Sequence, residues 1–197
     1  FGLMDMLFSG FDPDFFSPMV RRGQLDQLLL RPVSLTVQIF GSRFVLRRVG
    51  RIVEGVVFFV VAASLAQVQW SVAKLLYLPV VVASQVLFFG GLFIIGSTLT
   101  FWTMERIEAV NIFTYGGSEM TSYPMHIYPK WLRNICTYAV PAIFMNYYPA
   151  LYFLGKPDVL GFPAFAPFLA GTAGVGVMLA ALAFWRFGLR HYQSTGT

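Results

Sequence analysis

Apolar stretches without a charged residue occupy most of the chain after residue 54. They run over residues 55–73, 75–104, 134–155 and 159–185. A helix that crosses a bilayer needs about 20 predominantly apolar residues. The pattern predicts spans at about 52–69, 75–104 and 162–187 and favours an all-α integral membrane protein. We expect Gly171, Gly174 and Gly176 to allow close packing of the last span against a neighbouring helix.

Residues 20–34 have a different, amphipathic pattern. Leu25, Leu28 and Leu29 follow the i, i+3, i+4 spacing of one helix face, and Pro32 ends the helix. A short amphipathic helix is therefore predicted here. It either docks on a partner protein or lies on the membrane surface without one.

The segment that follows carries regularly spaced arginines. Arg43, Arg47 and Arg51 recur every four residues, so a helix would place them on one face, which we expect at the membrane surface. Glu54 lies three residues after Arg51, within reach of an ion pair on the same helix. Local pairing is favoured over a proton-carrying role for this carboxylate.

Residues 109–123 are only weakly apolar. Asn111, Tyr115 and Glu119 recur every four residues and share one predicted face. Such a segment crosses a membrane only if its polar face is buried in protein. The three residues are candidates for lining a translocation path, although Glu119 alternatively faces water at the outer end.

Residues 131–155 have enough apolar length to cross, but Pro141 and Pro149 interrupt them. Two half-helices that enter and leave on one side fit better than a continuous span. In that topology ten basic residues lie inside and four outside, whereas the opposite assignment for 109–123 and 131–155 gives twelve and two. The positive-inside rule prefers the second assignment, but charge counting does not settle the topology.

Composition excludes several classes of protein. The chain of 197 residues is 57% hydrophobic and 12% charged, whereas soluble domains are roughly a quarter charged. Of its fourteen basic residues, seven lie between Arg21 and Arg51, directly before the first apolar stretch. The net charge of +5 is thus a topology signal and does not indicate nucleic-acid binding. A soluble enzyme is excluded.

No cofactor site is expected within this chain. Cys136, His126 and His191 are too scattered for a zinc site, so no metal is implied. The phosphate-loop pattern G-x-x-x-x-G-K-[ST] is absent from the sequence. Any ATP must be hydrolysed on another chain, and this chain is not expected to be an enzyme by itself.

Two motifs resemble a known family. They are RRGQLDQLLLRP at Arg21–Pro32 and YPMHIYPKWLRNICTYAVPAIFMNYYPALYFLG at Tyr123–Gly155. The chain is similar to type-2 ABC transporter permeases, specifically the small bacterial exporter-like subunits with six spans. Because only four spanning elements are recognisable, we expect two further spans before Phe1.

The resemblance implies one transmembrane domain over 1–197, a helical bundle with a cytoplasmic coupling helix and an extracellular re-entrant hairpin. Residues 1–19 are expected to hold the end of a preceding span and a loop. The coupling and interfacial helices would follow at 20–51, and four spans at 52–187 would include the hairpin at about 130–155. Residues 188–197 would form a cytoplasmic tail.

The resemblance also assigns site residues. Coupling to the ATPase is expected at Arg21, Arg22, Gln24, Leu25, Asp26, Leu28, Leu29, Arg31 and Pro32. A charge cluster that would transmit ATPase closure to the spans comprises Glu105, Arg106 and Glu108. The hairpin residues either gate the outer exit or anchor the chain at the interface, and they are Tyr123, Tyr128, Pro129, Trp131, Pro141, Asn146, Tyr147, Tyr148 and Pro149.

The implied function is that of the transmembrane permease subunit of an ATP-driven exporter of hydrophobic or amphipathic molecules. Its expected partners are a dimer of cytoplasmic ABC ATPases that bind ATP and Mg²⁺, a second identical or related permease, and membrane lipid. Its expected location is the bacterial inner membrane, which it would cross several times. The alternatives are a structural or assembly subunit, or a secondary transporter.

Overall fold

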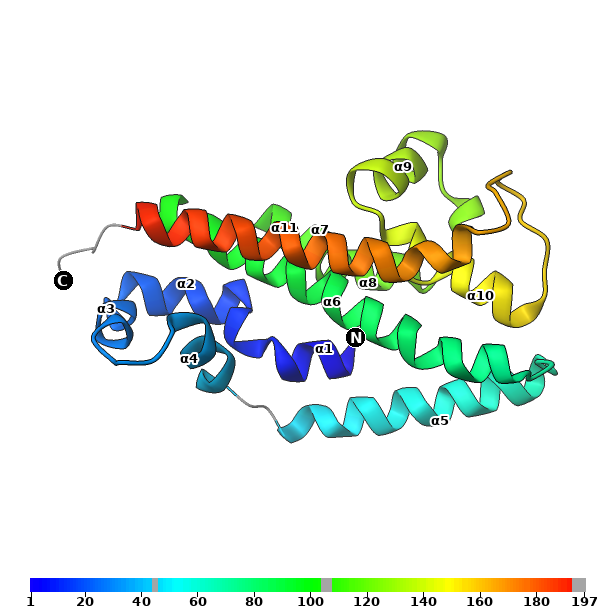
Figure 1. The fold of residues 1–197 in the computed structure, drawn as a ribbon, viewed down its shortest axis with the longest axis horizontal. Helices are drawn as coiled ribbons and strands as arrows, with labels where there is room; N and C mark the ends of the chain where they lie inside the picture. Colours follow the sequence, from blue (N-terminus) through cyan, green and yellow to red (C-terminus); the bar gives the residue numbers. More distant parts are fainter. Residues whose placement is uncertain (44–45, 104–107, 193–197) are drawn as a thin grey trace.

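The computed structural model describes residues 1–43, 46–103 and 108–192, and this part of the chain is entirely helical apart from its turns and loops. Two long helices, α6 (Val72–Thr103) and α11 (Leu169–His191), lie side by side along the molecule (Figure 1). Within the described residues, Val72–Thr103 and Ala166–His191 are the helices long and apolar enough to cross a membrane. These two helices match the second and last spans predicted from the sequence.

The first predicted span corresponds to α5 (Val49–Leu65), which has 17 residues. It buries none of its side chains, and its apolar residues, such as Phe58 and Val60, are exposed. Beyond Glu54 the helix carries no charged residue, and its unburied apolar side chains suit a lipid environment better than water. That α5 spans a membrane stays a prediction.

Small residues set the contact between α6 and α11. A Cβ atom added to Gly174 would lie 2.6 Å from the carbonyl oxygen of Ser84, and one added to Gly188 would lie 2.5 Å from Thr98 Cγ2. Residue numbers increase together on the two helices, so they run parallel. Gly174 packs closely as expected, whereas nothing lies within 4 Å of the same position at Gly176.

The N-terminal helices α1 (Gly2–Leu7) and α2 (Pro13–Arg21) pack against α6, with the 3-10 turn η1 (Ser9–Phe11) between them. The Ser97 hydroxyl on α6 donates to the Phe11 carbonyl. Trp185 of α11 is fully buried, with its ring centroid 5.2 Å from that of Phe11 and 5.6 Å from that of Phe16. One aromatic core therefore joins these helices.

Two short helices, α3 (Gln24–Leu29) and α4 (Leu35–Ser42), follow α2, and the turn η2 (Leu46–Arg48) precedes α5. The Trp185 indole donates to Thr36 Oγ1 on α4 at 3.1 Å. Arg43 follows α4 in extended backbone, with its guanidinium 4.8 Å from the centre of the Phe15 ring. The continuous helix expected to carry Arg43, Arg47 and Arg51 on one face is therefore wrong.

The weakly apolar segment forms α7 (Glu108–Phe113) and α8 (Tyr115–Thr121), which run antiparallel to α6. A Cβ added to Gly96 would meet Val110, and one added to Gly117 would meet Phe89, so the order of the contacts reverses along α6. In Figure 1 this segment lies beside the middle part of α6.

The expected hairpin is a series of short helices at the end of the molecule opposite α3 (Figure 1). They are η3 (Met125–Ile127), α9 (Lys130–Asn134), the π-helical η4 (Ile135–Ala139), η5 (Ala142–Phe144) and α10 (Tyr147–Leu154), followed by η6 (Ala166–Phe168) before α11. Pro141 lies at the break between η4 and η5, as its missing N–H predicts. A re-entrant path through a membrane stays a prediction.

Candidate functional site

The region α2–α3–α4 lies at the end of the molecule where α11 ends (Figure 1). Asp12 caps α2 by accepting a hydrogen bond from Asp14 N at 3.0 Å, and Pro13 occupies the first helical position. Gly23 adopts φ +65° between α2 and α3. Glycine reaches this left-handed region without a steric cost, so the chain can turn sharply into α3.

Three contacts fix α3 to the rest of the protein. Leu25 is 0% exposed, and Gln38 Nε2 on α4 donates to the Leu28 and Val33 carbonyls at 2.9 and 2.7 Å. The Tyr192 hydroxyl donates to Asp26 Oδ1 at 3.1 Å. Because Tyr192 directly follows α11, the position of α3 is linked to the end of a long helix.

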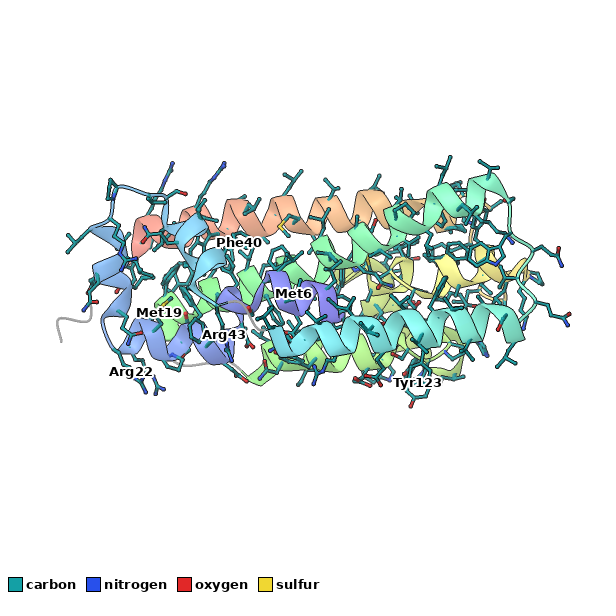
Figure 2. The ribbon with its side chains drawn as sticks, turned by 90° about the horizontal axis from the view of Figure 1, so that it is seen from below. Met6, Met19, Arg22, Phe40, Arg43 and Tyr123 are labelled. Atoms are coloured by element: carbon teal, nitrogen blue, oxygen red, sulfur yellow. The ribbon has the colours of Figure 1, made fainter. Side chains whose placement is uncertain are left out.

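The exposed surface of this region combines apolar and cationic side chains. Leu29 is 49% and Leu30 86% exposed, and the surrounding exposed residues are Arg21, Arg22, Gln24, Arg31, Pro32 and Val33. Arg22 projects from this end of the molecule (Figure 2). Exposed apolar groups ringed by charge are typical of a docking surface.

The expected leucine face is corrected in one respect. Leu25 belongs to the core and Leu28 is half-buried, so neither presents a fully exposed side chain. Leu30, which the amphipathic spacing did not select, is the most exposed apolar residue of the segment. Leu30 keeps helical backbone geometry, with φ −75° and ψ −12°, so its place five residues after Leu25 puts its side chain about 140° around the helix from that buried leucine.

The predicted charge cluster lies between α6 and α7, where the structure describes only part of the chain. Glu105 and Arg106 lie outside the described residues, and for Glu108 only the backbone at the start of α7 is described. The role assigned to these three residues stays a prediction.

The three candidate path residues have different surroundings. The Tyr115 hydroxyl donates to Asp12 Oδ2 at 2.9 Å, and its ring centroid lies 5.6 Å from those of Phe1 and Phe93. Tyr115 therefore joins α8 to the N-terminal segment inside this chain. Glu119 is exposed and Asn111 half-buried, and a role in lining a path stays a prediction for all three residues.

The predicted gate residues divide into a buried and an exposed group. Tyr147, Tyr148 and Pro149 are buried in α10, and the Asn146 amide donates to the Thr121 carbonyl. Tyr128 donates to the Met120 carbonyl at 3.2 Å, and Pro129 precedes α9. Tyr123 and Trp131 are 59% and 64% exposed, and Tyr123 projects from the side of the bundle (Figure 2). The buried group holds the hairpin, and the exposed group is free to contact lipid or a partner.

The sequence pattern did not single out Asp5, a buried charged residue. Asp5 on α1 is 0% exposed and forms an ion pair with Arg48, while the Arg51 guanidinium lies 3.8 Å from the same carboxylate. Among the side chains that the structure describes, Glu54 makes no ion pair, so the expected local pair with Arg51 is wrong. The sequence signal for this ion pair is an acidic residue within an apolar N-terminal segment. A carboxylate in such a segment is expected to be buried and therefore to need a partner of opposite charge.

The arrangement defines a class of protein. Within the described residues, an all-helical arrangement with two helices long and apolar enough to cross a membrane indicates a membrane protein. Residues 1–196 match the family described as ABC-2 family transporter protein, and the chain belongs to this family. It is thus a permease-type component of an ABC transporter, a class generally not catalytic itself and associated with an ABC ATPase. No curated protein and no solved structure matches the chain.

Proposed function

We propose that this chain forms the translocation unit of an exporter for hydrophobic or amphipathic molecules. A dimer of separate cytoplasmic ATPases, which hold ATP and Mg²⁺, docks on α2 and α3. Family membership and the exposed Leu29–Leu30 surface between arginines support this assignment. The conduit forms with a second permease, identical or related, in a bacterial inner membrane that the chain crosses several times.

The coupling step follows from how α3 is held. Leu25 inserts into the core, and Asp26 is tied to Tyr192 at the end of α11. An ATPase that displaces α3 therefore also pulls on α11, which packs along α6 through Gly174 and Gly188. Rigid helices packed this closely move together. Closure of the ATPase dimer is thus transmitted to the spanning helices and alternates their access.

The test is to replace Leu30 by glutamate in the full-length protein, purified with its co-expressed ATPase. Because Leu30 is 86% exposed, the fold should persist, while a charge in an apolar interface should weaken ATPase association by roughly tenfold or more. Leu46→Glu is the matched control, since Leu46 is 70% exposed and lies outside α3.

Co-purification and ATP hydrolysis are the measurements. Equal ATPase recovery with the Leu30→Glu and wild-type chains would contradict docking on α3. A chain that recovers no ATPase under mild conditions would instead favour the structural or secondary-transporter alternatives, which ion- or proton-coupled flux measurements then separate.

A further inference from the structure

A pocket at the end of the molecule opposite α3 has no role in the coupling described above. It has a volume of about 350 Å³, which is within the range of small-molecule sites. α9, η4 and the loop before η6 form its walls, with Ile143 of η5 at its base. The lining residues are Lys130, Arg133, Asn134, Thr137, Tyr138, Ile143, Val159, Leu160 and Phe162.

The charge of this pocket is positive. Lys130 and Arg133 lie three residues apart on α9 and therefore on neighbouring positions of one face. Within the described part of the chain, neither makes an ion pair with a carboxylate. The acid nearest in sequence to the opposite wall, Asp158, accepts hydrogen bonds from Leu160 N and Phe162 N at 2.9 and 2.7 Å. That carboxylate holds the loop, and in the described part of the chain it makes no ion pair with Lys130 or Arg133.

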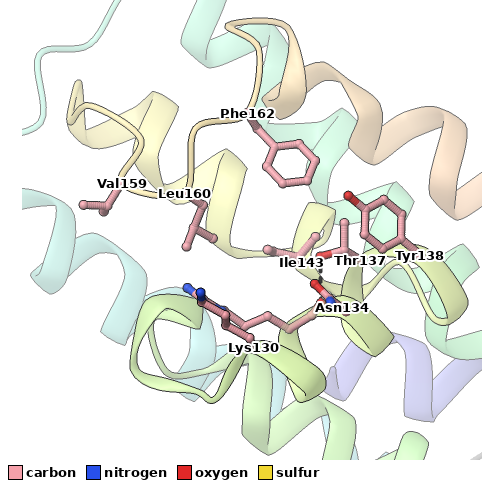
Figure 3. A pocket seen from close by; sticks show the side chains of 9 residues that line it. Lys130, Asn134, Thr137, Tyr138, Ile143, Val159, Leu160 and Phe162 are labelled. Carbon is pink, nitrogen blue, oxygen red and sulfur yellow. Dashed lines mark hydrogen bonds between the residues drawn. The ribbon is translucent and has the colours of Figure 1, made fainter.

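The opposite side of the pocket is apolar. Lys130 and Asn134 line one wall, and Val159 and Leu160 face them from the loop (Figure 3). Ile143 is fully buried, while Val159 is 74% exposed. A ligand that meets both walls must combine a negative group with an apolar body. Arginine and lysine bind phosphate and carboxylate oxygens through strong charge-assisted hydrogen bonds.

We propose that this pocket binds a phosphate or carboxylate group carried by an amphipathic molecule. The anion contacts Lys130 and Arg133 with support from the Asn134 amide, and the adjoining apolar part lies against Val159, Leu160 and Phe162. This inference goes beyond the proposed function and does not depend on ATPase docking, because it concerns binding to the permease chain alone.

The test measures binding to the purified full-length chain in an uncharged detergent, without ATPase, by isothermal titration calorimetry. The probes are dioctanoyl phosphatidic acid, dioctanoylglycerol with the same tails but no phosphate, and inorganic phosphate without tails. The wild-type chain should bind phosphatidic acid more tightly than either of the other two. Lys130→Gln combined with Arg133→Gln should weaken this binding at least tenfold, since each lost charged hydrogen bond is worth about one factor of ten or more.

Two further variants keep the result interpretable. Lys156→Gln removes an exposed cation that lines a different cavity at the same end and should leave binding unchanged. Val159→Glu adds a carboxylate to the apolar wall at an exposed position and should weaken binding without affecting the fold. Circular dichroism checks that each variant keeps its helix content.

Several outcomes would overturn the proposal. Equal binding of phosphatidic acid by the wild-type chain and the double variant would exclude the cations as the anion site. Equal binding of dioctanoylglycerol would exclude recognition of the anion. Inorganic phosphate that binds as tightly as phosphatidic acid would exclude the amphipathic ligand and leave a site for a free oxyanion.

Discussion

At the scale of single residues, the most demanding environment is that of Asp5. A carboxylate removed from water costs several kcal/mol unless a partner compensates its charge. Arg48, with 16% of its side chain exposed, provides that partner, while Arg51 is 66% exposed and lies at 3.8 Å. The amino-acid pattern supplied both signs of charge, but it pointed Arg51 to Glu54, because sequence spacing reveals only neighbours on the same helix.

Arg48→Gln should therefore lower the free energy of unfolding by about 3–5 kcal/mol, because it leaves a buried carboxylate without its counter-charge. Arg51→Gln is the control and should cost less than about 1 kcal/mol, as expected for an exposed pair. Denaturant unfolding in detergent measures both. If Asp5→Asn added to Arg48→Gln restored none of the loss, the ion pair would not be its cause.

A second residue-scale prediction concerns the link between α3 and α11. Burial and the contact with Asp26 raise the pKa of Tyr192 to about 12, so its hydroxyl remains a donor at neutral pH. Tyr192→Phe should cost about 1 kcal/mol of stability and should lower permease-stimulated ATP hydrolysis while ATPase co-purification persists. Tyr123→Phe, at an exposed tyrosine near the other end, is the control.

The pH dependence of this link follows from the direction of the shift. A tyrosine whose pKa is raised on folding stabilises the protein fully below about pH 10, the ordinary tyrosine value, and loses that contribution as pH rises through about 12. The stability difference between wild type and Tyr192→Phe should thus be constant from pH 6 to 9. A difference that vanished within that range would contradict the assignment.

At the scale of elements, close contact between α6 and α11 depends on individual glycines. Hydropathy located both helices well, because their apolar length exceeds the bilayer requirement whatever their neighbours are. It did not separate Gly174, which faces the Ser84 backbone, from Gly176, which faces open space. A uniformly apolar helix has no polar stripe from which its buried face could be predicted. The face that contacts protein is therefore decided by the partner helix.

Gly174→Ala should force α11 away from α6, because the new methyl group would lie 2.6 Å from a backbone oxygen that cannot rotate away. Overpacking of this kind costs about 1–3 kcal/mol. Gly176→Ala, two residues further along the same helix, should be neutral or slightly stabilising. Unfolding in detergent distinguishes the two, and equal stability of both variants would contradict the parallel packing register.

At the scale of the whole molecule, the two proposed sites lie at opposite ends. The α3 surface lies at one end, and the hairpin with its cationic pocket lies at the other (Figure 1). Charge counting alone does not settle the placement of residues 109–123 and 131–155, and the motif resemblance favours a re-entrant hairpin at 131–155. The antiparallel course of α7 and α8 along α6 does not place either segment relative to a membrane, so this topology stays a prediction.

The sequence by itself determined the helical membrane class, the two long apolar helices, the break at Pro141 and the family, because composition, apolar length and short motifs are local properties of the chain. Only the tertiary structure decided that Leu25 is core and Leu30 surface, that Asp5 pairs with Arg48, and that Tyr115 bonds to Asp12. It also brought Lys130 and Arg133 into one pocket with Val159 and Leu160. These are pairings between distant segments of the chain, and only the packing of the helices against one another brings such segments together.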